Sequence, residues 1–207
     1  MALVWLPLDD RTVEAVVAVA GTSWTRSELD GAWRAAGWPL PSGGSVAAEV
    51  FGANEYRFAV DDHRWVGVAM RFDPDEVTGF FLPFATYVDE QDPDDEDVHD
   101  LLSAAGPPWS GDPGATRADF DTRHHEAVAL LTARLGAPVV VGRHDEEWHH
   151  AVWRVGDRLV VLAQGEDFER YGMADNACLW VVHHDATRPV PAGEALYAFL
   201  CGDTTPA

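Results

Sequence analysis

Three pairs of adjacent histidines are the most chemically suggestive residues of this chain: His124-His125, His149-His150 and His183-His184. With His144 and Glu147 they concentrate imidazole and carboxylate groups in the second half of the sequence. A zinc site needs three or four such groups to converge tetrahedrally. Adjacent residues of a strand point to opposite faces, so at most one histidine of a strand pair can join a site. No His-Glu-x-x-His motif occurs, and we therefore expect no metal and no cofactor.

Nucleophilic and acid–base chemistry have little support. Cys178 lies in an apolar stretch typical of a buried strand, where a thiol is inert, and we expect both it and Cys201 to be reduced. No Gly-x-Ser-x-Gly elbow, phosphate-binding loop or dinucleotide-binding motif is present. Asp73, Asp75 and Glu76 could pair as an acid and a base. Among 35 acidic residues, however, such clustering is expected by chance.

Acidic charge is the feature with the clearest consequence for binding. The chain has 35 Asp and Glu against 14 basic residues, for a formal net charge of −21, and every basic residue is an arginine. A surface of this kind repels nucleic acids and anionic membranes and attracts basic molecules. We therefore expect a basic protein partner, with neither nucleic acid nor membrane as a target.

The acids are densest between residues 89 and 100. This acidic run holds eight of them: Asp89, Glu90, Asp92, Asp94, Asp95, Glu96, Asp97 and Asp100. We interpret the run as a surface for the basic partner, with Trp109 as an exposed aromatic anchor, since tryptophan is common at interface hot spots. The alternative is a solvated linker that leads into an ordinary helix N-terminus. Calcium is excluded, because an EF-hand loop that starts at Asp92 would have Asp97 where a glycine is required.

Helical periodicity and capping residues indicate the elements that carry these groups. We expect a helix from Asp10, as its cap, to Ala20, and a second helix that opens at the capping box Thr25-x-x-Glu28 and ends at Gly37. Another helix follows at Val98–Ala105. A long helix capped by Asp121 is indicated by apolar residues at helical spacing, and a closing helix by residues 191–202. The apolar stripe comprises Phe120, His124, Ala127, Val128, Leu131 and Leu135.

Strands and turns lie between these helices. Residues 56–60 alternate as a half-buried strand does, and Gly156-Asp157 predicts a two-residue hairpin turn, since glycine accepts the positive φ that such turns need. The apolar run Phe80–Val88 is broken by Pro83, so we expect an edge strand or a bulge there. Residues 106–118 are rich in Gly and Pro and predict a loop.

Internal similarity indicates a duplication. Four segments of the first half recur in order in the second: 16–24 in 101–109, 36–40 in 135–139, 60–69 in 155–163, and 84–88 in 178–182. We therefore predict an α+β fold of two similar helix-helix-strand-strand-strand units with antiparallel sheets and a C-terminal helix. The units are 1–90 and 91–207, within one compact structure. The alternative is that two unrelated halves share a common order of elements.

A family resemblance accompanies these motifs. The segment Trp24-Thr-Arg-Ser-Glu-Leu-Asp-Gly-Ala-Trp-Arg-Ala-Ala-Gly-Trp38 resembles the opening helix of uncharacterised actinobacterial families of small, acidic, Trp-rich α+β proteins. The Gly156-Asp157 hairpin and the apolar strand after it resemble immunity proteins of bacterial polymorphic toxin systems. The resemblance covers about half of the chain and brings no catalytic residues with it. It implies a cytoplasmic protein that binds another protein.

The expected function is that of a non-enzymatic acidic protein-binding module, of immunity-protein or secretion-chaperone type, which masks a basic partner surface. We expect a cytoplasmic location, because no signal peptide and no apolar run long enough to span a bilayer is evident. Two alternatives remain open. One is a small hydrolase or ligand-binding enzyme in which His144, His149, His183 and Asp75 converge between the halves. The other is a structural or oligomerising domain whose acids only provide solubility.

Overall fold

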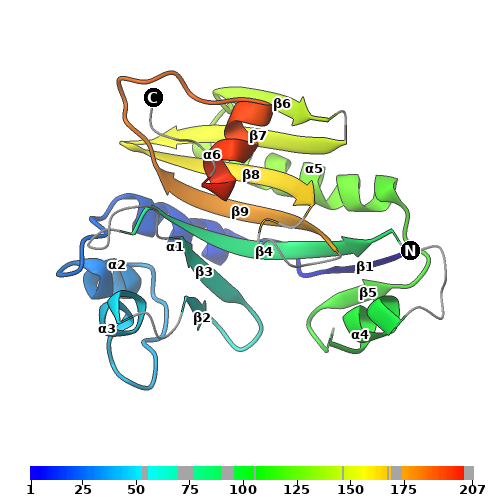
Figure 1. Cartoon of the computed structure of the whole chain (residues 1–207), viewed down its shortest axis with the longest axis horizontal. Coiled ribbons are helices and arrows are strands. Elements are labelled where there is room, and N and C mark those ends of the chain that lie inside the picture. The colour runs from blue at the N-terminus through cyan, green and yellow to red at the C-terminus, as the bar shows by residue number, and fades with distance from the viewer. Residues whose placement is uncertain are drawn as a thin grey trace.

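A computed structural model describes residues 1–52, 56–69, 77–89, 96–104, 106–145, 147–166, 168 and 174–202. Within these ranges the chain forms six helices and nine strands (Figure 1). The strands are β1 (Ala2–Trp5), β2 (Arg57–Ala59), β3 (Trp65–Ala69), β4 (Gly79–Val88), β5 (Ser110–Asp112), β6 (Val140–His144), β7 (Trp148–Val155), β8 (Arg158–Glu166) and β9 (Asp175–His183). The helices are α1 (Asp10–Ala20), α2 (Leu29–Ala35), α3 (Val46–Phe51), α4 (Glu96–Ala104), α5 (Arg117–Leu135) and α6 (Glu194–Cys201).

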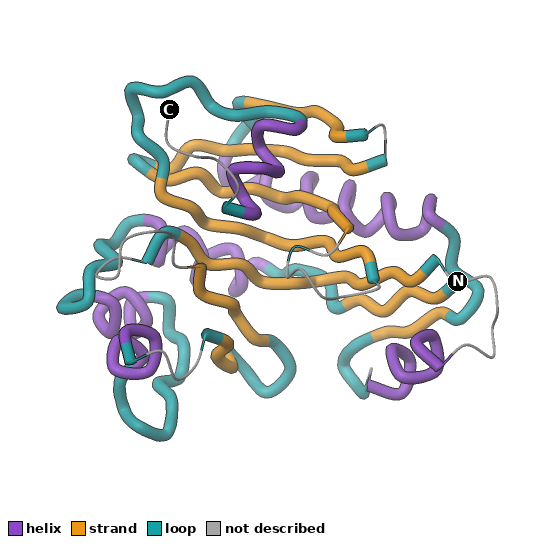
Figure 2. The backbone as a smooth tube through the Cα atoms, in the orientation of Figure 1, coloured by secondary structure: helices purple, strands orange, loops and turns teal. Residues whose placement is uncertain are grey.

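All nine strands belong to one antiparallel sheet, which both halves of the sequence share. Its main order is β2-β3-β4-β9-β8-β7-β6, so that the last strand of each half lies at the centre (Figure 2). The pairing of β4 with β9 extends from Gly79 opposite Val182 to Tyr87 opposite Asp175. The predicted α+β class, antiparallel pairing and closing helix are therefore confirmed, with a single continuous sheet in place of one sheet for each unit.

Strand β4 is central, and its outer edge is divided between two partners. Residues Gly79–Phe81 pair with β3, whereas Ala85–Val88 pair with β1, which in turn pairs with β5. Between them the register against β9 shifts at Pro83 and Ala85. The bulge expected from Pro83 is thus present. The edge strand is not, because Pro83 lies where β4 passes from one partner to the other.

The two faces of the sheet are covered by different helices. Tyr87 of β4 stacks on Phe120 of α5, whereas the next residue, Val88, packs with Val98 of α4. Because neighbouring side chains of a strand point to opposite faces, α5 and α4 lie on opposite sides of the sheet. Helix α1 shares the α5 side through its contacts with β8, β9 and α5, and α6 lies on the other side (Figure 1). We refer to these sides as the α5 face and the α6 face.

A cluster of aromatic rings fills the core on the α5 face near α1 and α2. Phe80 of β4 receives the edges of Trp24, Trp33 and Trp38, with ring centroids 4.8–6.5 Å apart, and Phe58 joins through Trp33. The indole nitrogen of Trp24 donates to the Val19 carbonyl at 3.0 Å, so this buried polar group is satisfied. Edge-to-face ring packing, together with a hydrogen bond from the indole N–H, is the favourable arrangement for a tryptophan in a core.

Several predicted elements are confirmed. Helix α1 has the predicted bounds, Gly156 with φ +61° turns between β7 and β8, and the closing helix lies within residues 191–202. Four residues of the predicted stripe, Phe120, His124, Ala127 and Leu131, are buried on α5. Cys178 and Cys201 are thiols and form no disulfide.

The predicted caps need correction. Asp9, not Asp10, caps α1, with its carboxylate accepting from the Thr12 amide at 2.8 Å. Helix α5 begins at Arg117, capped by Thr116, so Asp121 lies one turn inside it. The loop expected at 106–118 thus contains strand β5 and the start of α5.

The second predicted helix is also shorter than expected. It begins only at Leu29, and its N-cap residue Glu28 makes no capping bond with its side chain. The Thr25 hydroxyl instead donates to the Glu28 carboxylate at 3.0 Å. This bond between the Thr25 and Glu28 side chains closes the turn before the helix. It takes the place of the two bonds to backbone amides that a capping box would make.

Candidate functional site

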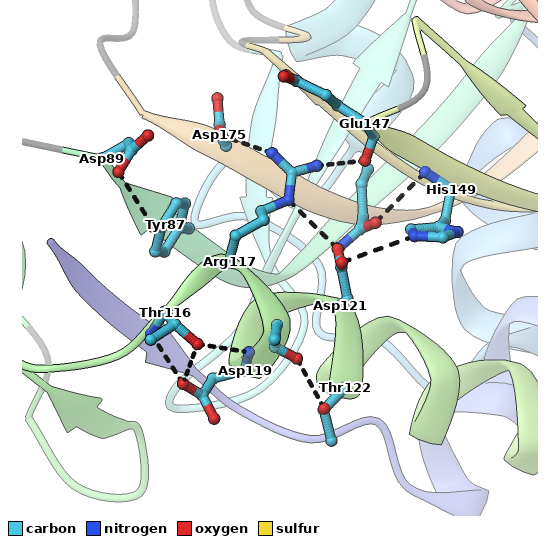
Figure 3. Close-up of polar contacts among 12 residues, drawn as sticks. Tyr87, Asp89, Thr116, Arg117, Asp119, Asp121, Thr122, Glu147, His149 and Asp175 are labelled. Carbon is cyan, nitrogen blue, oxygen red and sulfur yellow. Dashed lines mark hydrogen bonds and ion pairs between the residues drawn. The ribbon is translucent and has the colours of Figure 1, made fainter.

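Charged side chains gather where β4 and β8 end, β7 and β9 begin, and α5 starts (Figure 3). Arg117, from the first position of α5, lies at the middle of this group. Its guanidinium pairs with two carboxylates, and the charges of three more act on one of that pair, Asp175. We refer to these five as the carboxylate cluster: Asp89, Asp121, Glu147, Glu166 and Asp175. They come from segments far apart in the sequence, and the sheet brings their ends together.

The start of α5 fixes the direction of Arg117. Thr116 and Asp119 form a reciprocal capping box: the Asp119 carboxylate accepts from the Thr116 amide at 2.8 Å, and the Thr116 side chain accepts from the Asp119 amide (Figure 3). Such a box satisfies two amides that a helix N-terminus leaves without partners. Asp121, one turn after Arg117, then lies beside it and accepts from its Nε at 3.2 Å.

Arg117 reaches from the helix to the sheet. Its guanidinium lies 3.5 Å from the Asp175 carboxylate of β9 and donates to the backbone carbonyl of Glu147. The same group lies over the Trp148 ring, 4.2 Å from its centroid. These contacts clamp α5 to the ends of β7 and β9.

Negative charge exceeds positive charge in this cluster. Arg117 pairs with Asp121 and Asp175, but within the described residues Asp89, Glu147 and Glu166 make no ion pair. Burial, together with the charges of these three carboxylates, raises the pKa of Asp175 to about 6, although Arg117 acts in the opposite sense. One guanidinium therefore does not neutralise the carboxylates around it.

Tyr87 borders the cluster on β4. Its hydroxyl donates to the Asp89 carboxylate at 3.2 Å (Figure 3). Burial and the nearby charge of Asp89 raise the pKa of Tyr87 to about 12. The phenol is therefore a stable hydrogen-bond donor that holds Asp89, the first residue of the acidic run, at the edge of the cluster.

His124 and His125, one turn beyond Asp121 on α5, lie beside His149 of β7. Ring centroids of His124, His125 and His149 lie 5.1–5.9 Å apart, and His149 Nε2 lies 3.7 Å from the Asp121 carboxylate. Burial, reinforced by the neighbouring His149 and His125, lowers the pKa of His124 to about 3. Burial also lowers the pKa of His149, although Asp121 opposes the shift. The His124 and His149 rings are therefore neutral near pH 7.

Gln164 joins the histidines to the carboxylate cluster. Its amide nitrogen donates to Asp121 at 3.2 Å, and its oxygen accepts from the His149 backbone amide at 3.3 Å. The Tyr197 hydroxyl from α6 donates to the Gln164 backbone carbonyl across the sheet. Gln164 is fully buried, so these bonds satisfy a side chain that would otherwise destabilise the core.

Candidate metal ligands and the Cys178 thiol lie apart from one another in the described part of the chain. Among the described residues, no group of histidine, cysteine and acidic side chains has the geometry to hold a metal ion. The Cys178 thiol is buried on the α6 face, because Cys178 pairs with Ala163 and alternates with Ala177 of the α5 face. It is therefore separated from the histidines by the sheet.

The four residues of the enzyme hypothesis do not meet in the described part of the chain. His149 faces α5, whereas the His144 ring packs against Tyr197 of α6, at 4.6 Å between centroids. His183 lies opposite Arg158 at the other end of β9. Asp75, like Asp73 and Glu76, lies outside the described residues. His144, His149 and His183 therefore do not converge on a common cleft between the two halves.

The structure describes the acidic run only in part. Asp89 lies at the carboxylate cluster, and Asp100 is exposed on α4. Glu96 and Asp97 belong to the first turn of α4. Glu90, Asp92, Asp94 and Asp95 lie outside the described residues. Sequence reasoning missed Arg117, Glu166 and Asp175 and considered Glu147 only as a possible metal ligand beside His144. Thr116-x-x-Asp119 and Arg117-x-x-x-Asp121 are nevertheless readable as a capping box and a helical ion pair.

Trp109 lies away from this cluster. Its ring is half-buried on the α6 side, and its indole nitrogen donates to the His63 carbonyl at 2.9 Å. Trp24, the residue that resembles it in the first half, is fully buried beside Phe80. The two tryptophans therefore differ in surroundings.

Comparison of the chain with family models, with curated proteins and with solved structures finds no match. Among the described residues, no helix is both long and apolar enough to cross a membrane.

Proposed function

We propose that this protein is a non-enzymatic acidic binding protein, of immunity-protein or secretion-chaperone type, that masks a basic surface of a partner in the cytoplasm. The carboxylate cluster is the observation that carries the proposal. It presents the exposed Asp89, Glu147 and Glu166 around a half-buried Arg117–Asp175 pair, at the point where the acidic run begins.

The energetics of the cluster favour a cationic partner. Burial and the repulsion of neighbouring carboxylates together raise the pKa of Asp175, so its charged form is disfavoured in this cluster. An arginine or lysine brought among Glu147, Glu166 and Asp89 would relieve that repulsion and form charge-assisted hydrogen bonds. The net charge of −21 would also accelerate the encounter with a basic protein through electrostatic steering.

The proposal is tested with a short arginine-only peptide as the probe. Its binding is measured by fluorescence anisotropy over NaCl concentrations on both sides of the physiological value. We expect the affinity to fall steeply as salt rises, because screening weakens interactions between exposed charges. The double substitution Glu147→Gln with Glu166→Gln should weaken binding about tenfold.

A matched control separates the cluster from the overall charge. Glu14→Gln with Glu49→Gln removes the same two charges from an exposed position on α1 and a half-buried position on α3, two helices that are not part of the carboxylate cluster (Figure 1). This pair should reduce affinity much less. Equal losses for the two pairs would show that the acids act only as a diffuse field, and binding indifferent to salt would refute the proposal.

We also infer that the two halves are related units, 1–90 and 91–207. The sheet order supports this: β4 and β9 form the central pair, and β3 and β8 flank them. The helices do not add support, because α1 and α4, which carry the similar segments 16–24 and 101–109, lie on opposite faces of the sheet. The segments 60–69 with 155–163 and 84–88 with 178–182 that resemble each other in sequence lie in these corresponding strands. A separate protein that consists of one such unit would support the duplication.

A further inference from the structure

A small pocket opens on the α6 face, at the fork where β4 parts from β3 and continues beside β1. It has a volume of about 100 Å³, which is room for a group of a few non-hydrogen atoms. Four aromatic residues line it: Trp65, Phe81, Trp109 and Phe168. This pocket lies apart from the carboxylate cluster and takes no part in its contacts.

The aromatic walls come from four separate segments. Trp65 is on β3, Phe81 on β4, Trp109 directly before β5, and Phe168 between β8 and β9. The Trp65 and Phe81 rings meet edge to face at 5.7 Å, and Phe81 stacks on Trp180 at 4.8 Å. Rings held in this way form a rigid wall, so a ligand would not need to order them.

Trp109 closes the open side of the fork. Its bond to the His63 carbonyl ties the segment before β5 to the turn between β2 and β3. Trp65, Phe81 and Trp109 each remain partly exposed around the pocket, although the chain buries most of its other tryptophans. Partly exposed rings around a concave surface are characteristic of a binding site more than of a core.

The chemistry of the pocket matches an organic cation. The faces of aromatic rings attract ammonium and guanidinium groups, and cages of such rings bind them. Within the described residues no cationic side chain lines the pocket. The Arg57 guanidinium lies over the Trp65 ring, 4.7 Å from its centroid, so this indole already binds a cation within the fold and a ligand would have to contact the rest of its surface.

Two polar side chains in the lining add hydrogen-bond acceptors. Thr86 donates its hydroxyl to the Asn176 side-chain oxygen at 3.0 Å, and Asn176 donates to the Ala174 carbonyl at 3.2 Å. These bonds fix both oxygens in the lining, where each keeps acceptor capacity for an N–H group. The net charge of −21 raises the local concentration of cations at any such site.

We propose that this pocket binds one guanidinium or ammonium head group, supplied by an arginine or lysine side chain of the basic partner. The proposal rests on the function proposed above for the source of the side chain, because a basic partner presents many such groups. The pocket would give local selectivity, whereas the carboxylate cluster would provide the long-range attraction.

The test compares two small probes of similar shape, butylguanidinium and its neutral counterpart butylurea. Binding to the full chain is followed by the NMR signals of the tryptophan indole N–H groups. We expect butylguanidinium to shift the signals of Trp65 and Trp109, and butylurea to bind about tenfold more weakly. Trp65→Leu should weaken butylguanidinium binding by a similar factor, and Trp5→Leu, on the α5 face, should not.

Equal binding of the two probes would overturn the proposal, because the pocket would then select for shape and apolar surface only. Absence of shifts at Trp65 and Trp109 would also overturn it. The unsubstituted protein decides both outcomes, so the test does not depend on whether Trp65→Leu folds. Because it uses no partner, its failure is distinguishable from the salt and charge-variant results that test the proposed function.

Discussion

His124 carries two ring nitrogens that hydrogen-bond to no other described residue, at a place on α5 where its side chain is only 2% exposed. His125, His149, Asp121 and the Leu162 carbonyl surround it. Its pKa of about 3 in the folded state lies well below the value of 6.5 expected in the unfolded chain. As the pH falls below 6.5, His124 binds a proton in the unfolded state but stays unprotonated in the folded state. Stability is therefore lost from pH 6.5 down to about 3.

His124→Met should reduce this sensitivity to acid. A methionine fills the same apolar site without a titratable group. We expect the loss of unfolding free energy between about pH 7 and pH 4 to be smaller in the variant by roughly 2–3 kcal/mol. Urea unfolding at each pH measures it. His125→Met, at an exposed position on the same helix, is the control; identical pH profiles for His124→Met and the unsubstituted protein would contradict the explanation.

Helix α5 depends at its start on a cap that also positions Arg117. Thr116→Ala removes the one hydroxyl that accepts from the Asp119 amide and also donates to the Asp119 carboxylate. We expect a loss of about 1 kcal/mol in unfolding free energy, measured by urea denaturation. Thr122→Ala is the matched control, because Thr122 only donates back to the Ala118 carbonyl within the helix. A loss at Thr122 as large as the loss at Thr116 would show that capping is not the cause.

Strand β3 approaches β4 closely at Gly67. A Cβ atom there would lie 2.1 Å from the Phe81 ring, which covers this glycine. Gly67→Ala should therefore displace Phe81 and destabilise the fold by roughly 1–3 kcal/mol. Because Phe81 lines the aromatic pocket, the indole signal of Trp65 should also shift in the NMR spectrum.

Gly31 on α2 provides a control for Gly67→Ala, because the same substitution there should stabilise the protein instead of destabilising it. Nothing lies within 4 Å of a Cβ built there. In an exposed helical position alanine is favoured over glycine, so Gly31→Ala should stabilise the protein by up to about 1 kcal/mol. Thermal unfolding of the two variants compares them directly. Destabilisation by both would mean that backbone changes, and not the Phe81 contact, dominate at Gly67.

For the whole molecule, a net charge of −21 has opposite consequences for folding and for binding. Self-repulsion of the acids destabilises the compact state, so added NaCl should raise the unfolding temperature until the charges are screened. The same salt should weaken binding of a basic partner. Calorimetry over a salt series, beside binding measurements in the same buffers, checks both. A melting temperature that falls with salt would show that specific ion pairs, and not self-repulsion, dominate.

Periodicity and turn chemistry were sufficient for many local features. The bounds of α1, the apolar stripe of α5, the Gly156 turn and the closing helix all follow from patterns of neighbouring residues. Caps were less predictable, because Asp9 and Asp10 are equally good caps in isolation. In the structure the Asp9 carboxylate also lies 4.0 Å from the Arg64 guanidinium, a contact that neighbouring residues in the sequence do not reveal.

Composition and local order, which are properties of the sequence itself, determined the acidic character of the protein and the α+β succession of its elements. The tertiary structure alone decided three features. Strand β4 lies at the centre of the sheet, Arg117 of α5 pairs with Asp175 of β9, and four distant aromatic residues share one pocket. The physical reason is range: capping and periodicity act over a few residues, whereas strand pairing joins residues about ninety positions apart, such as Thr86 and Asn176. The sequence around one residue of such a pair therefore does not indicate which distant residue it will contact in the sheet.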